Sequence, residues 1–163
     1  MLSHLICRPS ERLQLIRAGC GMQISSRFTI AVHVLICIET FKNDYKVTSE
    51  FLASSVNVNP VVIRRLLQQL KKAGLITVKR GSGGADTGKP LDEITLLDVY
   101  NAVECVEEGN LFHFHENPNQ RCPVGKNIHA LLDVRLEEIQ KAMEREMRSV
   151  SIKDIMEDAE KLM

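Results

Sequence analysis

The chain has 163 residues, of which 44% are hydrophobic and 26% charged, and its 21 basic and 21 acidic side chains give a net charge of zero. The length suggests one domain, or one domain with an appendage, and the composition is ordinary for a globular protein. The lack of Trp argues against an aromatic stacking platform for single-stranded nucleic acid. Five cysteines without regular spacing, and no apolar run of membrane-spanning length, indicate a reduced cytoplasmic protein rather than a secreted or membrane protein.

Residues 1–21 carry no clear amphipathic pattern linked to the residues after them, and we expect a disordered N-terminal extension there. A helix is predicted over residues 26–41, with Ser25 or Ser26 as its N-cap. Its interior, residues 28–38, is apolar nearly all round, so this helix needs cover on more than one side. A partner subunit is one source of that cover.

Two shorter helices come next. The first spans residues 47–56, with Thr48 or Ser49 as cap, and the second spans residues 60–73, with Pro60 at its first position and Gly74 beyond its end. The second helix carries one apolar stripe at helical spacing, formed by Ile63, Leu66, Leu67 and Leu70.

A strand is predicted over residues 75–79, followed by a glycine-rich turn and a returning strand over residues 91–94. Thr95 then begins a helix that runs to about Val106, with Asp98 in a capping-box role. Residues 107–121 form a polar loop. A long helix opens at Pro123 or Asn127 and runs to about Arg148, and a last short helix starts at Ser151.

This order of elements is that of a winged helix-turn-helix, and the fold class we predict is mainly α with a small β-hairpin wing. Its second helix enters the major groove, while the wing reaches the backbone or the minor groove. Residues 42–90 hold nine basic and three acidic residues, whereas residues 91–163 hold eight and sixteen. Such a basic block is a footprint for a polyanion, with chance clustering as the alternative.

The face of helix 60–73 opposite its leucines carries residue types that read DNA. Arg binds guanine with two hydrogen bonds, Gln binds adenine, and Val contacts a thymine methyl. The alternative is a solvated polar face on a core helix. The predicted DNA-binding residues are Thr48, Ser49, Asn59, Val61, Val62, Arg64, Arg65, Gln68, Lys79, Arg80 and Lys89.

Several segments in their order resemble the Rrf-two family of winged-helix transcription regulators, the group that contains IscR, NsrR and CymR. They are MQISSRF from Met22, Leu52-Ala53, LLQQLKKAGLI at 66–76, the arginine–glycine wing at 80–84 and ITLLDVYNAVE at 94–104. The resemblance covers residues 22 to about 155. It implies a DNA-binding domain at 22–106, a sensor-type loop at 107–126, and dimerisation and C-terminal helices at 127–163. It also implies a homodimer that binds double-stranded DNA. The two-fold symmetry of a homodimer predicts a palindromic operator, and we expect a repressor, with an activator as the alternative.

The chain departs from the family in its cysteines. Cluster-binding members carry three closely spaced cysteines before the long helix, whereas the loop here has only Cys122, and Cys105 lies in the preceding helix. One thiolate is too few for an iron–sulfur cluster, so no cofactor is expected. Redox or ligand sensing by Cys122, His113 and His115 remains open, as does a metal site built on the two histidines.

The long helix predicts a dimer because its apolar positions form a seam too long for the small domain to cover. The predicted interface residues are Ile128, Leu132, Leu136, Ile139 and Met143. No nucleophile–base pair, phosphate-binding loop or carboxylate pair emerges, so an enzyme is not expected. The alternative function is a protein-interaction module that uses the winged helix for assembly without specific DNA binding.

Overall fold

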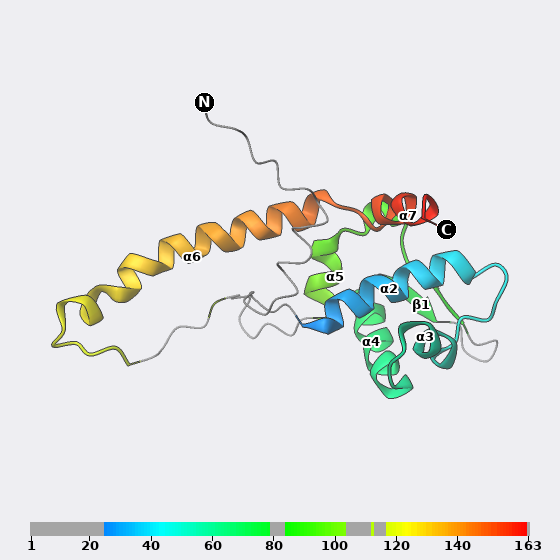
Figure 1. Cartoon of the computed structure of the whole chain (residues 1–163), viewed down its shortest axis with the longest axis horizontal. Coiled ribbons are helices and arrows are strands. Elements are labelled where there is room, and N and C mark those ends of the chain that lie inside the picture. The colour runs from blue at the N-terminus through cyan, green and yellow to red at the C-terminus, as the bar shows by residue number, and fades with distance from the viewer. Residues whose placement is uncertain (1–24, 79–83, 104–111, 113–116, 163) are drawn as a thin grey trace, which may run out of the picture.

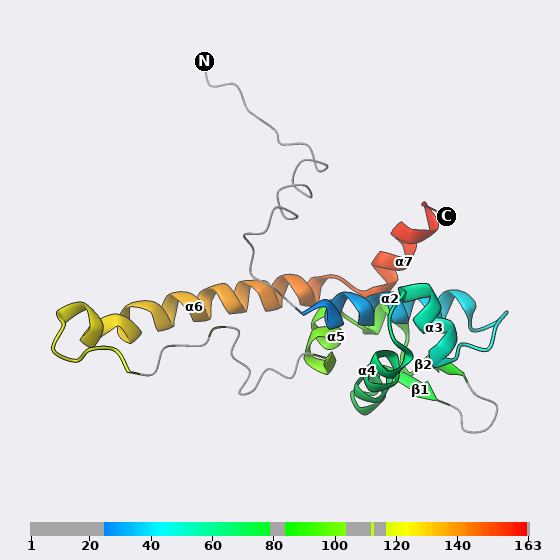
Figure 2. The ribbon, with the colours of Figure 1, turned by 60° about the horizontal axis from the view of Figure 1, so that its bottom comes forward.

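The computed structural model describes residues 25–78, 84–103, 112 and 117–162 (Figures 1 and 2). The predicted extension at 1–21 and most of the predicted sensor loop lie outside these residues. The elements in chain order are α2 (Ser26–Phe41), α3 (Ser49–Val56), α4 (Pro60–Lys72), β1 (Ile76–Val78), β2 (Ala85–Thr87), the 3₁₀ turn η1 (Leu91–Glu93), α5 (Leu96–Val103), α6 (Pro123–Ser149) and α7 (Ile152–Glu160). None of the described helices is long and apolar enough to cross a membrane. The mainly helical fold with a small hairpin is confirmed.

Short polar side chains set the starts of the first three helices, and the caps of the first two are those that the sequence predicts. The Ser25 hydroxyl accepts a hydrogen bond from the backbone N–H of Arg27, and the Thr48 hydroxyl accepts one from Phe51. The Asn59 side chain caps α4 by accepting from the N–H of Val61. Between α3 and α4, Asn57 takes the left-handed conformation with φ of 58°. Asn tolerates this conformation better than most residues, which allows the tight turn that joins the two helices.

The core of the domain forms around α2. Its side chains Val34, Leu35 and Ile38 are fully buried, and α2 packs against α3, α4, α5, β2 and α7. The chain itself therefore supplies cover on several sides of α2. Burial of each such apolar side chain stabilises the folded state by about 1.5–3 kcal/mol relative to leaving it exposed.

The wing closes earlier than the sequence predicts. The partner of β1 is β2, which pairs antiparallel with Ile76 opposite Thr87, whereas the predicted returning strand at 91–94 is wrong, because residues 91–93 form η1. The reason lies at Gly88, where a Cβ would come within 2.6 Å of the Gly74 carbonyl oxygen. Backbone therefore passes directly over backbone here, which only glycine permits.

A short joint connects the long helix to the domain. The capping boxes of α5 and α7, formed by Thr95 with Asp98 and by Ser151 with Asp154, lie next to each other, because Thr95 and Ser151 pair in an isolated antiparallel bridge. The backbone N–H of Leu96 donates to Val150 and that of Ile152 donates to Ile94. Both predicted helix starts, at Thr95 and Ser151, are confirmed.

The helix α6 extends away from the domain (Figures 1 and 2). It has 27 residues and begins at Pro123, the earlier of the two predicted starts. It packs against α5, and none of its residues, all of which the structure describes, is buried. At 1.5 Å per residue it is about 40 Å long, so most of its surface lies outside the domain.

We predict that Thr95→Ala lowers the free energy of unfolding by about 1 kcal/mol, because it removes the hydroxyl that caps α5 and orders the joint. Urea denaturation followed by circular dichroism measures the change. Thr29→Ala is the matched control, since the exposed Thr29 hydroxyl only donates to the Ser26 carbonyl. Equal stability of the Thr95 variant and the wild type would contradict the capping role.

Candidate nucleic-acid interface

The outer face of α4 is fixed by the residues on its inner face. Ile63, Leu66 and Leu70 are at most 2% exposed, so the opposite side of the helix must face solvent. Val61 and Val62, in its first turn, are 48% and 40% exposed. Exposed valine side chains at the start of a helix in the major groove can contact thymine methyl groups. Arg65 and Gln68 are also exposed on this helix.

A surface hollow lies where α4, α3 and the wing meet. Arg64, Gln68 and Lys71 of α4 line one side of it. Thr48 and Ser49, at the start of α3, line another side, and Val78 and Gly84 of the hairpin complete it. The structure therefore brings the predicted residues of α3 and α4 together with the base of the wing.

Arg64 binds two residues of α3, which the sequence does not reveal. Its guanidinium forms an ion pair with Glu50 of α3, and its Nε donates to the Ser49 hydroxyl at 3.3 Å. The Arg64 hydrogen bond is the main cause that lowers the pKa of the Glu50 carboxyl. Both side chains are more than half exposed, so the pair adds little stability, but it orients Arg64 toward α3. A base contact by Arg64 would have to compete with Glu50.

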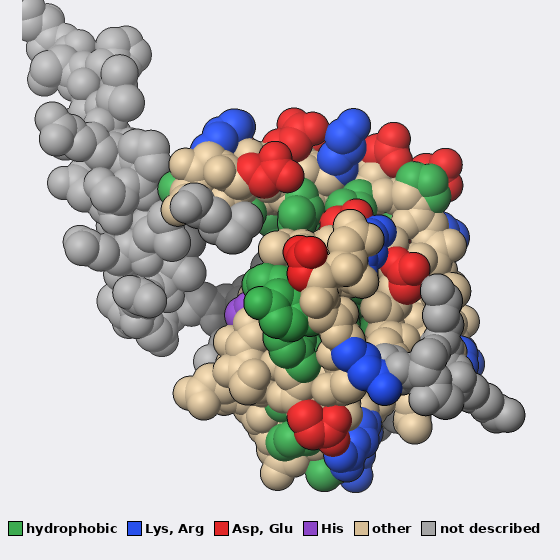
Figure 3. Space-filling view, turned by 90° about the vertical axis from the view of Figure 1, so that its right-hand side faces the viewer, with side chains coloured by type: hydrophobic (Ala, Val, Ile, Leu, Met, Phe, Trp, Pro, Cys, Tyr) green, Lys and Arg blue, Asp and Glu red, His purple; other side chains and the backbone are tan. Residues whose placement is uncertain are grey.

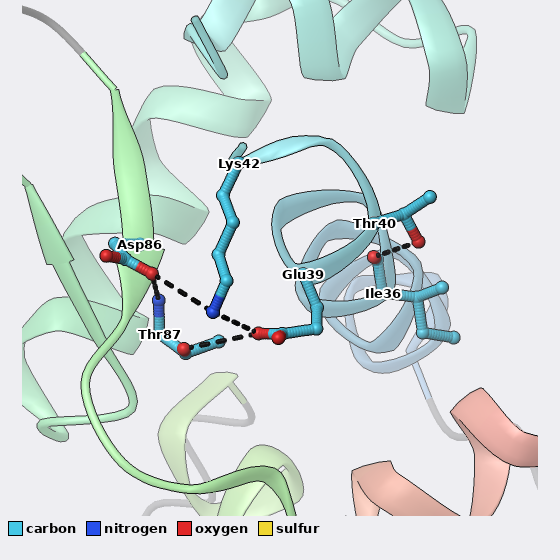
Figure 4. A network of polar contacts seen from close by, with 6 residues as sticks. All are labelled: Ile36, Glu39, Thr40, Lys42, Asp86 and Thr87. Carbon is cyan, nitrogen blue, oxygen red and sulfur yellow. Dashed lines mark hydrogen bonds and ion pairs between the residues drawn. The ribbon is translucent and has the colours of Figure 1, made fainter. Parts of the chain in front are cut away.

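A polar network ties the wing to α2 (Figure 4). The Lys42 ammonium lies 2.8 Å from a Glu39 oxygen and 3.6 Å from Asp86 of β2, and the Thr87 hydroxyl donates to Glu39. The Glu39 hydrogen bond raises the pKa of Lys42. Lys42 belongs to the basic block by sequence, yet two carboxylates neutralise it here, so it holds the wing in place rather than binding a polyanion.

The remaining predicted wing residues are only partly described. Lys89 is exposed just beyond β2. Lys79 and Arg80 lie outside the described residues. On the face shown in Figure 3, most acidic side chains lie in the upper part.

Cys122 is the N-cap residue of α6 and is partly exposed. The backbone N–H groups of Gly125 and Val124 lower the pKa of its thiol. A Cβ on Gly125 would come within 2.6 Å of the Asn119 carbonyl oxygen, so glycine permits the close loop before the helix. His113 and His115 lie outside the described residues.

The two thiols that the structure describes lie in different parts of the fold. Cys37 is buried in the core, 3.3 Å from the Ser55 hydroxyl, whereas Cys122 begins α6 at the end that points away from the domain (Figure 1). Within the described part of the chain, no three His, Cys, Asp or Glu side chains gather as a metal site requires. A cluster needs several thiolates close together.

Comparison with known proteins gives consistent matches. The Rrf2 family model, described as an iron-dependent transcriptional regulator, matches residues 24–158. YwnA of Bacillus subtilis, whose name describes an HTH-type transcriptional regulator, is 49% identical over 82% of this chain and 96% of its own length. A crystal structure described as that of a DNA-binding protein is 43% identical, with a TM-score of 0.65 over 80% of this chain and 98% of that one. IscR of T. potens has the same fold, with a TM-score of 0.66 at 18% identity over 89% of this chain and 93% of its own.

We predict that Cys122 reacts with iodoacetamide at a midpoint pH below that of an ordinary thiol, because the N-terminal amides of α6 lower the pKa of its thiol. As pH falls, Cys122 should remain reactive below the pH at which an ordinary thiol loses its reactivity. Mass spectrometry of the peptide that contains Cys122 gives the rate at each pH, with glutathione as the control thiol. A midpoint at or above that of glutathione would contradict the lowered pKa.

Proposed function

Because the chain belongs to the Rrf2 family of transcriptional regulators, we propose that it represses transcription as a homodimer bound to a palindromic operator. It is a DNA-binding transcription regulator and not an enzyme. The observation that carries the proposal is the outer face of α4. On this face the exposed Val61 and Val62 of the first turn are followed by the exposed Arg65 and Gln68. The opposite face of α4 is buried in the core. Because a transcription regulator acts where the DNA is, we place its action in the cytoplasm.

The geometry supports reading of base edges by the first half of α4. In helix-turn-helix proteins the N-terminal residues of the second helix contact base edges. Val61, Val62 and Arg65 lie in the first six residues of α4 and are exposed. Asn59 is also exposed, although its side-chain oxygen is used by the cap.

We predict that Arg65→Ala weakens binding to a specific site by about 1–3 kcal/mol, because it removes a bidentate contact to a base. The site is first selected from random double-stranded DNA with the wild-type protein, and affinities are then measured by fluorescence anisotropy. Lys153→Ala, which removes a positive charge from α7, is the control. Unchanged affinity and unchanged base preference in the Arg65 variant would remove Arg65 from the reading surface.

The homodimer is supported by the uncovered surface of α6. Leu131, Leu132 and Ile139 are 61%, 39% and 48% exposed. At 100° per residue, they share one side of the helix with Ile128, and the half-buried Leu136 and Met143 lie at its edge. Exposed apolar surface of this extent marks an association site. An antiparallel or crossed pair of α6 helices would cover it by a two-fold contact.

We predict a mass near twice 18.4 kDa in light scattering at micromolar concentration. Ile139→Glu should give monomers with weakened operator binding, because a charge then lies in the apolar seam and each half-site must be bound alone. Val134→Glu is the matched control, since Val134 is 58% exposed but lies off the seam. A monomeric wild type, or equal dissociation in both variants, would contradict the α6 interface.

The protein is proposed to work without an iron–sulfur cluster, with Cys122 as the sensing group and His113 and His115 as further candidates. This is supported by the separation of Cys37 from Cys122 and by the lowered pKa of Cys122. Iron and sulfide analysis of anaerobically purified protein tests whether a cluster is present. Stoichiometric iron would contradict the proposal.

A further inference from the structure

A second hollow lies on the other side of α4, between this helix and the start of α2. Its volume is about 460 Å³, and its described lining consists of Arg27 from α2 together with Val62, Arg65, Leu66, Gln68, Gln69 and Lys72 from α4. Gln68 lines this hollow and also the one beside α3 and the wing, so it forms the crest of α4. Arg65 and Lys72 lie on the α2 side of the crest, and Arg64 and Lys71 on the other.

The charges on the two sides of the crest differ. The hollow beside α3 contains Glu50, whose carboxylate is paired with Arg64. The described residues that line the hollow beside α2 include three cations, Arg27, Arg65 and Lys72, and no carboxylate. Arg27, Arg65 and Lys72 are all exposed. The side facing α2 is therefore the more strongly attractive to an anion.

The position of this hollow suits a phosphate of the DNA backbone. When a helix lies in the major groove, the two sugar–phosphate strands run along its two sides. Arg65 is in the half of α4 that contacts base edges, which leaves Arg27 and Lys72 for the strand beside α2. Arg27 is the second residue of α2, and its backbone is fixed there by the Ser25 cap.

We propose that Arg27 is a phosphate-binding residue of the DNA interface that anchors one strand beside α4, independently of base sequence. The proposal rests on the DNA-binding function above. Arg27 lies 37 residues before Arg64 in the chain, outside the basic block, and only the packing of α2 on α4 brings it to this face.

The test compares Arg27→Gln with the wild type on the selected specific site and on unrelated duplex DNA, over a range of salt concentrations. One lost phosphate contact should reduce the slope of log affinity against log salt by about one and weaken binding to both DNAs roughly tenfold near 0.1 M salt. Arg27→Lys keeps the charge and should keep the slope. Lys153→Gln removes the same charge from α7 and should leave both quantities unchanged.

Other outcomes separate the two proposals. If the wild type binds but Arg27→Gln, with unchanged circular dichroism, keeps both slope and affinity, the anchor is overturned and the DNA-binding function stands. A loss confined to the specific site would also overturn it, since Arg27 would then act on a base. If the wild type binds neither DNA, both proposals fail.

Discussion

The burial of Ile63, Leu66 and Leu70 fixes the rotation of α4 about its own axis, and the rest of the interface depends on this constraint. A rotation of one residue, about 100°, would place a leucine in water and an arginine in the core. Because neither is tolerated, the crest at Gln68 and the basic residues on its two sides have defined positions before any DNA is bound. Preorganisation of this kind reduces the entropy lost on binding.

A second constraint connects the elements that support α4 to α6, the helix of the proposed dimer contact. The bridge between Thr95 and Ser151 joins the start of α5, which packs on α2 and α4, to the segment between α6 and α7. A movement of α6 would therefore act on the elements that support α4 rather than on a flexible linker. Cys122 lies at the opposite end of α6, so a chemical change there would have to reach α4 along the helix or through the partner.

The sequence predicts the local features well, because they depend on a few neighbouring residues. Ser25, Thr48, Thr95 and Ser151 each act as caps with partners two or three positions away, and the stripe of α4 repeats at helical spacing. The second strand is not predictable in the same way, because Ala85–Thr87 is short and has only one buried residue, which leaves little alternation to detect. Contacts between distant residues, such as Glu50 with Arg64 and Lys42 with Asp86, could not be predicted, because they depend on how helices and wing are packed.

Two copies of α4, held by one dimer, are proposed to bind two related half-sites. Hydroxyl-radical footprinting of the selected DNA tests this most directly, because it shows which sugars the protein protects on each strand. We expect two protected segments related by two-fold symmetry, with centres separated by about 10 base pairs or a multiple of that spacing. A single protected segment, unchanged as the protein concentration rises, would contradict the claim.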